Sequence, residues 1–351
     1  MLPLSKVILV LPNKIVRVKV VWIHLKERKI HAVNMEMMKE PRRVVLSGAS
    51  GLLGGALLQT LAAQGDQAVQ LVRHLPGRSS RGEGERGKSL LLEWNPMAGV
   101  PFADPARLEG LKAAVHFSGA NISARRWTRA YRQEMTESRL VTTAALVRTL
   151  SRLERPPEVL LAASAIGFYG DRGEEMLDEQ APAGNGFFPE LCKQWEAAAR
   201  PAMEAGIRVV HLRFGIVLSS KGGALAKMLP LFRLGLGGRL GNGRQWMSWI
   251  GLDDAVRAML FAMETTSLQG PANVTAPNPV TNREFTRTLA GQLRRPALAP
   301  APAFALRLAL GQMADEALLA SARVFPRKLL SAVSVSQSAL DIATSRARQP
   351  G

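Results

Sequence analysis

The sequence contains a single cysteine, Cys192, among 351 residues, which excludes an internal disulfide. Its five histidines are scattered and show no spacing typical of metal ligands. No apolar run approaches the roughly 18 residues that a membrane helix needs, and the N-terminus lacks the pattern of a cleaved secretion signal. We therefore expect a soluble, cytoplasmic protein with no metal site and no membrane partner.

A concentrated run of basic residues is also lacking, although the formal net charge is +18. Residues 1–41 hold eight Lys and Arg against three acids, and the remaining basic residues are interspersed with many acids. Affinity for nucleic acid depends on a concentrated basic patch, so we expect no nucleic-acid partner. A solvated basic surface explains the charge, and an anionic ligand such as a phosphorylated cofactor is the alternative.

The composition changes at Pro41, because the first 41 residues are rich in Lys, Val and Ile and the following chain is rich in Ala, Gly, Leu and Arg. We hypothesise that residues 1–41 are a dispensable N-terminal extension. Met35, Met37 or Met38 would then be the natural beginning of the protein.

From Arg42 onward, short apolar strands alternate with helices, a pattern that predicts an α/β fold with a doubly wound parallel sheet. We expect strands at "RRVVLSG", "QAVQLVR", "SLLLEW", "AAVHFSG", "EVLLAASAI" and "IRVVHLRFGIVL", and helices over 51–65, 127–152, 190–205 and 281–295. The polar segment 78–88 is expected to be a loop.

The domain organisation follows from where this alternation stops. Residues 42–220 are expected to form one domain built on this sheet, completed by part of the later chain. Beyond Ser219 the pattern becomes irregular and Gly-rich, so residues 221–332 are expected to form a smaller C-terminal substrate lobe. Residues 333–351 are expected to be a disordered tail.

A glycine-rich turn between the first strand and the first helix carries the clearest functional signal. Gly48, Gly51 and Gly54 permit a tight turn, allow close approach of a pyrophosphate, and leave the free N–H groups of the helix N-terminus to bind it. With a strand before it and a helix after it, the motif is specific. We expect the pyrophosphate to be held by Gly48, Ser50, Gly51, Leu52, Leu53 and Gly54.

The end of the second strand indicates which dinucleotide is bound. An NAD enzyme normally places Asp or Glu there to bind the ribose hydroxyls, whereas this chain reads "LVRH". The guanidinium of Arg73 suits a 2'-phosphate, so we expect NADP. The alternative is that Arg73 and His74 are solvated residues at the end of a strand.

The chain resembles the extended short-chain dehydrogenases/reductases, and more narrowly the epimerase-like family of 39U or "cell-division-inhibitor-like" type. The resemblance covers about Arg43 to Ala332 and rests on several segments in order, including "SGASGLLG", "AVHFSGANI", "SAIGFYGD", "CKQWEAAA", "GNGRQWMSWI" and "VFPRKLL". It implies an NADP-binding Rossmann domain with a small C-terminal lobe. It also implies that the cofactor is contacted by Val72, Arg73, Phe117, Ser118, Gly119, Glu134, Arg139 and Phe188. For Glu134 and Arg139, ordinary charges on a helix surface are the alternative.

The resemblance also shows what is missing. Extended members use a Tyr, a Lys four residues later, and a Ser or Thr on a strand for proton transfer. Here these positions hold Phe188, Cys192 and Ala165. The substitute proton donors are Tyr169, Ser164 and Cys192, and a structural role is the alternative for each. We therefore assign no catalytic residue.

The substrate side of the site is expected to be lined by Asn121, Trp127, Ser164, Tyr169, Arg213, Trp246 and Trp249, because strand ends and the second lobe converge there. Trp246 and Trp249 have the alternative of only packing the lobes together. The sequence thus predicts an NADP-dependent oxidoreductase or epimerase acting on an unidentified small molecule. The alternative is a non-catalytic NADP(H)-binding sensor or scaffold, and a homodimer is left open.

Overall fold

The computed structural model describes residues 41–74 and 89–333, together with the backbone of strands at 6–11, 14–25, 28–36 and 83–86. The chain divides into two compact units, residues 1–42 and 43–351. In the first unit, β1 (Lys6–Leu11), β2 (Lys14–Leu25) and β3 (Arg28–Glu36) form an antiparallel sheet with β2 in the centre. That this segment is dispensable stays a prediction.

The second unit is built on an eight-stranded sheet with the strand order β15-β11-β9-β8-β4-β5-β7-β6. All neighbouring strands run parallel except β6, which pairs antiparallel with β7 at one edge. The bounds are β4 Arg43–Ser47, β5 Gln67–Val72, β6 Glu83–Arg86, β7 Ser89–Glu93, β8 Ala113–His116, β9 Val159–Ala165, β11 Arg208–Phe214 and β15 Gly270–Val274.

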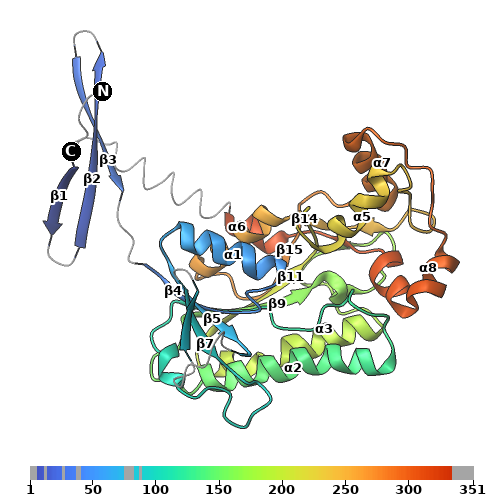
Figure 1. The fold of residues 1–351 in the computed structure, drawn as a ribbon, viewed down its shortest axis with the longest axis horizontal. Helices are drawn as coiled ribbons and strands as arrows, with labels where there is room; N and C mark the ends of the chain where they lie inside the picture. Colours follow the sequence, from blue (N-terminus) through green and yellow to red (C-terminus); the bar gives the residue numbers. More distant parts are fainter. Residues whose placement is uncertain are drawn as a thin grey trace. The chain divides into compact units, whose positions relative to one another are not determined.

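Helices cover both faces of this sheet (Figure 1). On one face lie α1 (Leu52–Ala63) and α6 (Leu252–Glu264), and on the other lie α2 (Arg129–Leu150) and α3 (Phe187–Ala197), followed by α4 (Arg200–Glu204). Leu57 and Met259 are fully buried in the first core, and Leu146 and Leu150 in the second. Strands covered on both faces read as continuous apolar runs, which explains segments such as "VLLAASA". The predicted doubly wound α/β fold is confirmed.

The order of the strands fixes the position of the site. The chain runs from β4 outward through β5 and β7, and then returns to β8 on the other side of β4. The direction of winding therefore reverses between β4 and β8. Ligands of open α/β sheets bind at such a switch point, outside the carboxyl ends of the strands.

The smaller lobe contains α5 (Gly223–Arg233), α7 (Asn282–Leu293) and α8 (Ala303–Leu310). Short strand pairs join it to the rest of the unit: β12 (Ile216–Leu218) with β14 (Trp249–Gly251), β13 (Trp246–Met247) with β16 (Val280–Thr281), and β10 (Met176–Leu177) with β17 (Arg323–Val324). Between these elements α6 and β15 return to the large sheet, so the later chain completes that layer. Three short helical turns complete the list of elements: η1 (Pro105–Leu108), η2 (Ile166–Tyr169) and η3 (Ala314–Leu319).

Three predicted elements differ in the structure. The predicted polar loop at 78–88 contains strand β6. The predicted helix at 190–205 is two helices, because Pro201 has no N–H to continue the first one. The predicted strand at 207–218 is interrupted at Gly215, where a Cβ would lie 2.6 Å from the carbonyl oxygen of Ser248.

The tail predicted to be disordered lies outside the described residues from position 334 onward. Among the residues that the structure describes, no helix has both the length and the apolar character needed to cross a membrane.

Candidate functional site

The glycine turn after β4 has the geometry that its sequence predicts. Gly48 has φ of +70°, and a Cβ there would lie 2.8 Å from the carbonyl carbon of Phe117 on the neighbouring strand end. A Cβ at Gly54 would lie 2.3 Å from the carbonyl oxygen of Gly48. Gly48 is needed for its backbone conformation and Gly54 for the close contact between helix and turn.

The N-terminus of α1 is open to an anion. Gly51 is its exposed N-cap residue, no side chain caps the helix, and the first turn holds no acid. A Cβ at Gly51 would meet only the carbonyl oxygen of Gly48, at 3.3 Å. The first N–H groups of α1, from Leu52 and Leu53 onward, therefore donate to no side-chain cap, and the neighbouring Ser50 is exposed. This cradle fits a pyrophosphate, because the N–H groups and the helix dipole favour negative charge there.

The tip of β5 lies next to this turn in the strand order. Val72 is half-buried, whereas Arg73 is exposed and its guanidinium has no carboxylate partner within the described part of the chain. His74 lies 3.7 Å from Glu93, measured from Nδ1 to Oε1. Among the described contacts at this strand end, the carboxylate of Glu93 lies beside His74 and not beside Arg73. Arg73 is therefore available to an anionic ligand.

A buried polar chain supports the floor of the site. Ser47 Oγ lies 2.7 Å from Nδ1 of His116 and accepts a hydrogen bond from the Phe117 backbone N–H at 3.2 Å. Nε2 of His116 lies 3.3 Å from Oγ1 of Thr142 on α2. Complete burial lowers the pKa of His116 to about 4, so the ring is neutral at physiological pH. These contacts fix the end of β8, from which Phe117 and Ser118 continue, at the switch point.

Arg139 is a core residue and not a helix-surface charge. Its guanidinium donates to the carbonyl oxygens of Met135 and Ala120, both at 3.0 Å, and lies 5.0 Å from the ring centroid of Trp195. A Cβ at Gly119 would lie 3.1 Å from its Cγ, so Arg139 packs directly under the loop after β8. These contacts hold the loop after β8 in its position.

Glu134 points in another direction, as its spacing of five residues from Arg139 predicts. It is exposed and pairs with Arg125 at 3.5 Å. A contact between Glu134 and the cofactor stays a prediction.

The carboxyl ends of β9 and β11 are joined by a buried ion pair. Arg213 forms two hydrogen bonds of 2.8 Å to Glu196 of α3, and Ser164 Oγ donates to the same carboxylate at 2.7 Å. The guanidinium also stacks 3.5 Å from the ring centroid of Phe168. Burial alone would lower the pKa of Arg213, but the hydrogen bonds and charge of Glu196 outweigh it and raise the pKa.

Tyr169 extends this network into the core. Its hydroxyl accepts from Arg213 at 3.0 Å and donates to Oδ1 of Asn273 at 2.8 Å, and its side chain is completely buried. Burial raises the pKa of Tyr169, although Arg213 partly counteracts this. The polar atoms of Tyr169, Arg213 and Ser164 are therefore occupied by each other and by Glu196. These contacts give the three residues a structural role, and a contact of any of them with substrate stays a prediction.

Phe188 and Cys192 occupy the buried face of α3. The ring of Phe188 packs on η2, where a Cβ at Gly167 would lie 2.5 Å from it, and its N–H donates to Glu316 at 2.6 Å. Cys192 is fully buried, and burial together with the charge of Glu196 raises the pKa of its thiol to about 12. Cys192 is therefore a poor proton donor, as expected for a small core residue.

The other residues predicted on the substrate side divide into two groups. Trp127 is 5% exposed and donates from Nε1 to the carbonyl oxygen of Ile122 at 2.7 Å, so it packs the loop. Trp246 donates to Glu174 at 2.6 Å. In contrast, Trp249 has a buried Nε1 with no partner in the described part of the chain. Asn121 is exposed, but its Oδ1 already accepts hydrogen bonds from the N–H and the hydroxyl of Ser123, both at 3.0 Å. A substrate contact of either residue stays a prediction.

The comparisons with known proteins agree with this geometry. Residues 44–274 match the NAD dependent epimerase/dehydratase family, and residues 301–332 match a domain of unknown function, DUF1731. The chain belongs to the NAD dependent epimerase/dehydratase family. The predicted resemblance to the atypical, epimerase-like branch of the extended short-chain dehydrogenases/reductases is confirmed by the relatives described next.

Curated relatives include the epimerase family protein Mb2239 of Mycobacterium bovis, which is 42% identical over 82% of this chain and 90% of the relative. The human epimerase family protein SDR39U1 is 34% identical over 82% of this chain and 93% of the relative. The crystal structure of human SDR39U1 with NADPH superposes with a TM-score of 0.72, at 32% identity, covering 83% of this chain and 93% of that one. A nucleoside-diphosphate sugar epimerase from Corynebacterium glutamicum gives a TM-score of 0.64 at 28% identity, covering 90% of this chain and 67% of that one.

The buried network of α3 and the strand ends contains residues that the sequence did not indicate. Glu196, His116 and Asn273 were not predicted as site residues. For His116 and Asn273 the signal was a polar residue in an apolar strand, as in "AAVH" and "GPANV", whereas Glu196 lies on α3 and had no such signal. That signal marks a buried polar group without naming its partner.

The close packing of the turn predicts opposite effects for two adjacent glycines. We expect Gly54→Ala to reduce the free energy of unfolding by about 1–3 kcal/mol, because its Cβ would overlap a backbone oxygen that cannot move alone. Gly55→Ala is the matched control. Its Cβ would lie 3.5 Å from the nearest atom, so it should stabilise the helix by about 0.5–1 kcal/mol. Chemical denaturation measures both, and equal effects would contradict the geometry.

The buried ion pair predicts a large loss of stability in Glu196→Gln. The isosteric change leaves the 4% exposed side chain of Arg213 without its counter-charge, which costs about 3–5 kcal/mol when one partner of a buried pair is removed. Glu190→Gln, on the exposed face of the same helix, should leave the denaturation midpoint almost unchanged. Similar midpoints for the two variants would show that the Glu196 pair is not structurally important.

The neutral His116 predicts a pH dependence of stability. Below pH about 6.5 the unfolded chain takes up a proton on this residue, whereas the folded protein does so only near the lowered pKa of about 4. Between these values His116 therefore lowers the free energy of unfolding by about 1.4 kcal/mol per pH unit as the pH falls. NMR titration of the imidazole in the folded protein measures the pKa directly, and a midpoint near 6.5 would refute the assignment.

Proposed function

We propose that the protein is an NADP(H)-dependent oxidoreductase or epimerase that acts on a small molecule and supplies no tyrosine-lysine pair. The observation that carries this proposal is the uncapped N-terminus of α1 behind the glycine turn, at the switch point between β4 and β8. The bound cofactor supplies the hydride chemistry, and the protein's task is to hold and orient it. Gly48, Gly51 and Gly54 form the cradle for its pyrophosphate.

The choice of NADP over NAD rests on Arg73. Its exposed side chain follows β5 directly, where a 2'-phosphate on the adenosine ribose would lie in this architecture. The human relative SDR39U1 was crystallised with NADPH, which supports the same assignment. An acid, which would repel that phosphate, is not found at positions 72–74.

The side chains that the sequence offers as substitute proton donors are buried or engaged in other contacts. Tyr169 and Cys192 are completely buried, Ser164 is bonded to Glu196, and Lys193 is exposed and paired with Glu190 at 3.2 Å. A reaction that needs only hydride transfer, with water as the proton source, fits this arrangement. The same observation favours a second candidate, an NADP(H)-binding sensor that performs no turnover.

NADPH fluorescence separates these two candidates. The protein is saturated with NADPH and exposed to a metabolite extract, and an enzyme should oxidise the cofactor in a protein-dependent manner. Unchanged fluorescence across fractionated extracts, with binding intact, would favour the sensor. Failure of NADPH to bind at all would overturn both.

Arg73→Ala should weaken NADPH binding by about tenfold or more and NADH binding by less than about twofold, because only the former has the 2'-phosphate that makes charge-assisted bonds. Arg73→Lys is the matched control and should give an intermediate affinity, since it keeps the charge and loses the paired geometry. Calorimetric titration with both cofactors measures the difference. Equal losses for the two cofactors would refute the role of Arg73.

A further inference from the structure

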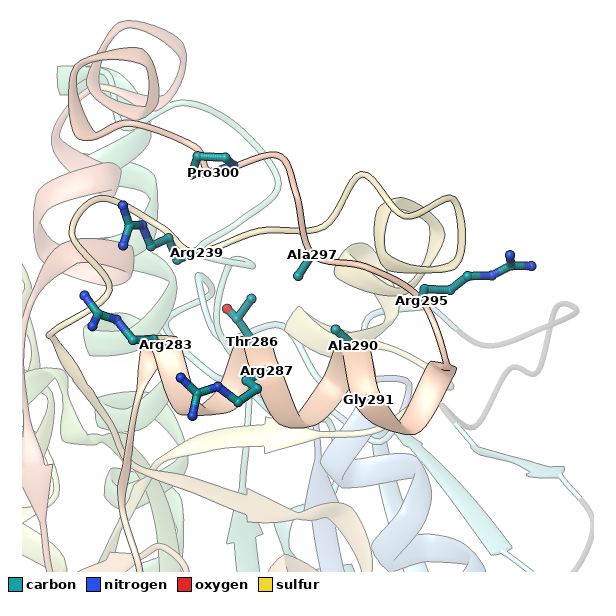
Figure 2. Close-up of a pocket in the computed structure, with 9 residues that line it drawn as sticks. All are labelled: Arg239, Arg283, Thr286, Arg287, Ala290, Gly291, Arg295, Ala297 and Pro300. Atoms are coloured by element: carbon teal, nitrogen blue, oxygen red, sulfur yellow. The ribbon is translucent and has the colours of Figure 1, made fainter.

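A basic cavity lies in the smaller lobe, formed by α7, the loop before β13 and the link between α7 and α8. Its volume is about 540 Å³, within the range of small-molecule sites. The wall consists of Arg239, Arg283, Thr286, Arg287, Ala290, Gly291, Arg295, Ala297 and Pro300 (Figure 2). None of these residues belongs to the predicted cofactor or substrate site.

All four arginines are exposed, and three of them start from neighbouring positions of the backbone. A Cβ on Gly243 would lie within 3.4 Å of the side chains of both Arg239 and Arg283, so these two stems are adjacent. Arg287 follows Arg283 by one helical turn on the same face of α7. In Figure 2 their guanidinium groups lie at one end of the cavity, whereas Arg295 extends at the opposite end.

These positive charges are not balanced within the lobe. The segments 233–248 and 281–300 contain seven arginines and a single acid, Glu284. Oε2 of Glu284 accepts from the N–H and hydroxyl of Thr281 in the capping box of α7, both at 2.8 Å, and the Glu284 carboxylate interacts electrostatically with Arg287 alone among these arginines. No acid lines the cavity. Arginines placed side by side without counter-charges repel one another, and a bound anion would remove that repulsion.

We propose that this cavity binds a small molecule that carries two or more linked phosphate groups. Arginine forks match phosphate oxygens in paired, charge-assisted hydrogen bonds, and three adjacent forks suit a di- or triphosphate better than a single anion. The Ala290, Ala297 and Pro300 side of the cavity then accommodates an organic part of the ligand. The site is separate from the glycine turn, so its ligand acts as a second ligand beside the dinucleotide.

The position of Gly291 allows a sharp test. This glycine is exposed in the last turns of α7, and a Cβ there would meet no atom within 4 Å. Gly291→Glu therefore introduces a negative charge at the cavity without a clash, and Gly291→Gln introduces the same shape without the charge. Both replace a helical glycine by a better helix former, so neither is expected to unfold α7.

The full chain is saturated with NADPH and titrated in a calorimeter with sodium tripolyphosphate and, separately, with ATP. The cofactor-free protein is titrated with tripolyphosphate alone. We expect saturable 1:1 binding, weakened about tenfold or more by Gly291→Glu and by less than about threefold by Gly291→Gln. Tighter binding of ATP would identify a nucleotide ligand, and equal binding would identify the phosphate chain itself. Because tripolyphosphate is also titrated into the cofactor-free protein, the test of this cavity does not depend on the cofactor proposal.

Arg283→Gln/Arg287→Gln should weaken binding about tenfold or more. The matched control Arg148→Gln/Arg200→Gln removes the same charge from exposed positions on α2 and α4 and should change the affinity less than about twofold. Absence of saturable binding, or equal losses in the two double variants, would overturn the proposal. Tighter binding of single-stranded RNA or anionic vesicles, unaffected by Gly291→Glu, would also overturn it, because the cavity would not be the binding surface.

Discussion

The contact between the Gly48 backbone and the end of β8 determines the geometry of the whole site. Gly48 sits at positive φ against Phe117, and Gly54 packs on the carbonyl of Gly48. These two contacts bring the N-terminus of α1 to the point where the sheet reverses its winding. The Ser47–His116–Thr142 chain and the buried Arg139 hold the same loop from below. The proposed pyrophosphate cradle is thus fixed by backbone packing at Gly48 and Gly54.

The region that carries proton transfer in extended relatives is here part of the core. Helix α3 presents Phe188 and Cys192 to an apolar cluster, and Glu196 to Arg213. Ser164 and Tyr169, two hydroxyl groups near the ends of β9 and β11, are hydrogen-bonded into the same network. A buried, paired carboxylate and guanidinium are costly to separate. An acid-base role for these groups would require that separation, so their contacts argue against such a role for them.

The local features of the fold could be predicted from the sequence, because glycine spacing, apolar runs and helix breaks act over a few residues. The turn at Gly48, the strands around it and the helix begun at Thr281 follow from such patterns. Strand β6 was missed because a polar edge strand has the composition of a loop. The partners of Arg213 and Tyr169 were missed for another reason. Tyr169 and Asn273 are 104 positions apart, and only the register of β9, β11 and β15 brings them together.

The grouping of charges in the smaller lobe also depends on contacts between residues far apart in the sequence. It leads to a physical distinction between the two proposed anion sites. In sequence the arginines of the smaller lobe are dispersed, and folding brings Arg239 beside Arg283 and Arg287. The α1 cradle attracts anions through backbone N–H groups and a helix dipole, whereas the proposed second site uses full charges on flexible side chains. Salt screens exposed full charges over about 8–10 Å at moderate ionic strength. The arginine cavity should therefore lose affinity with added salt more steeply than the cradle, so ionic strength alone can separate the two binding events in one protein.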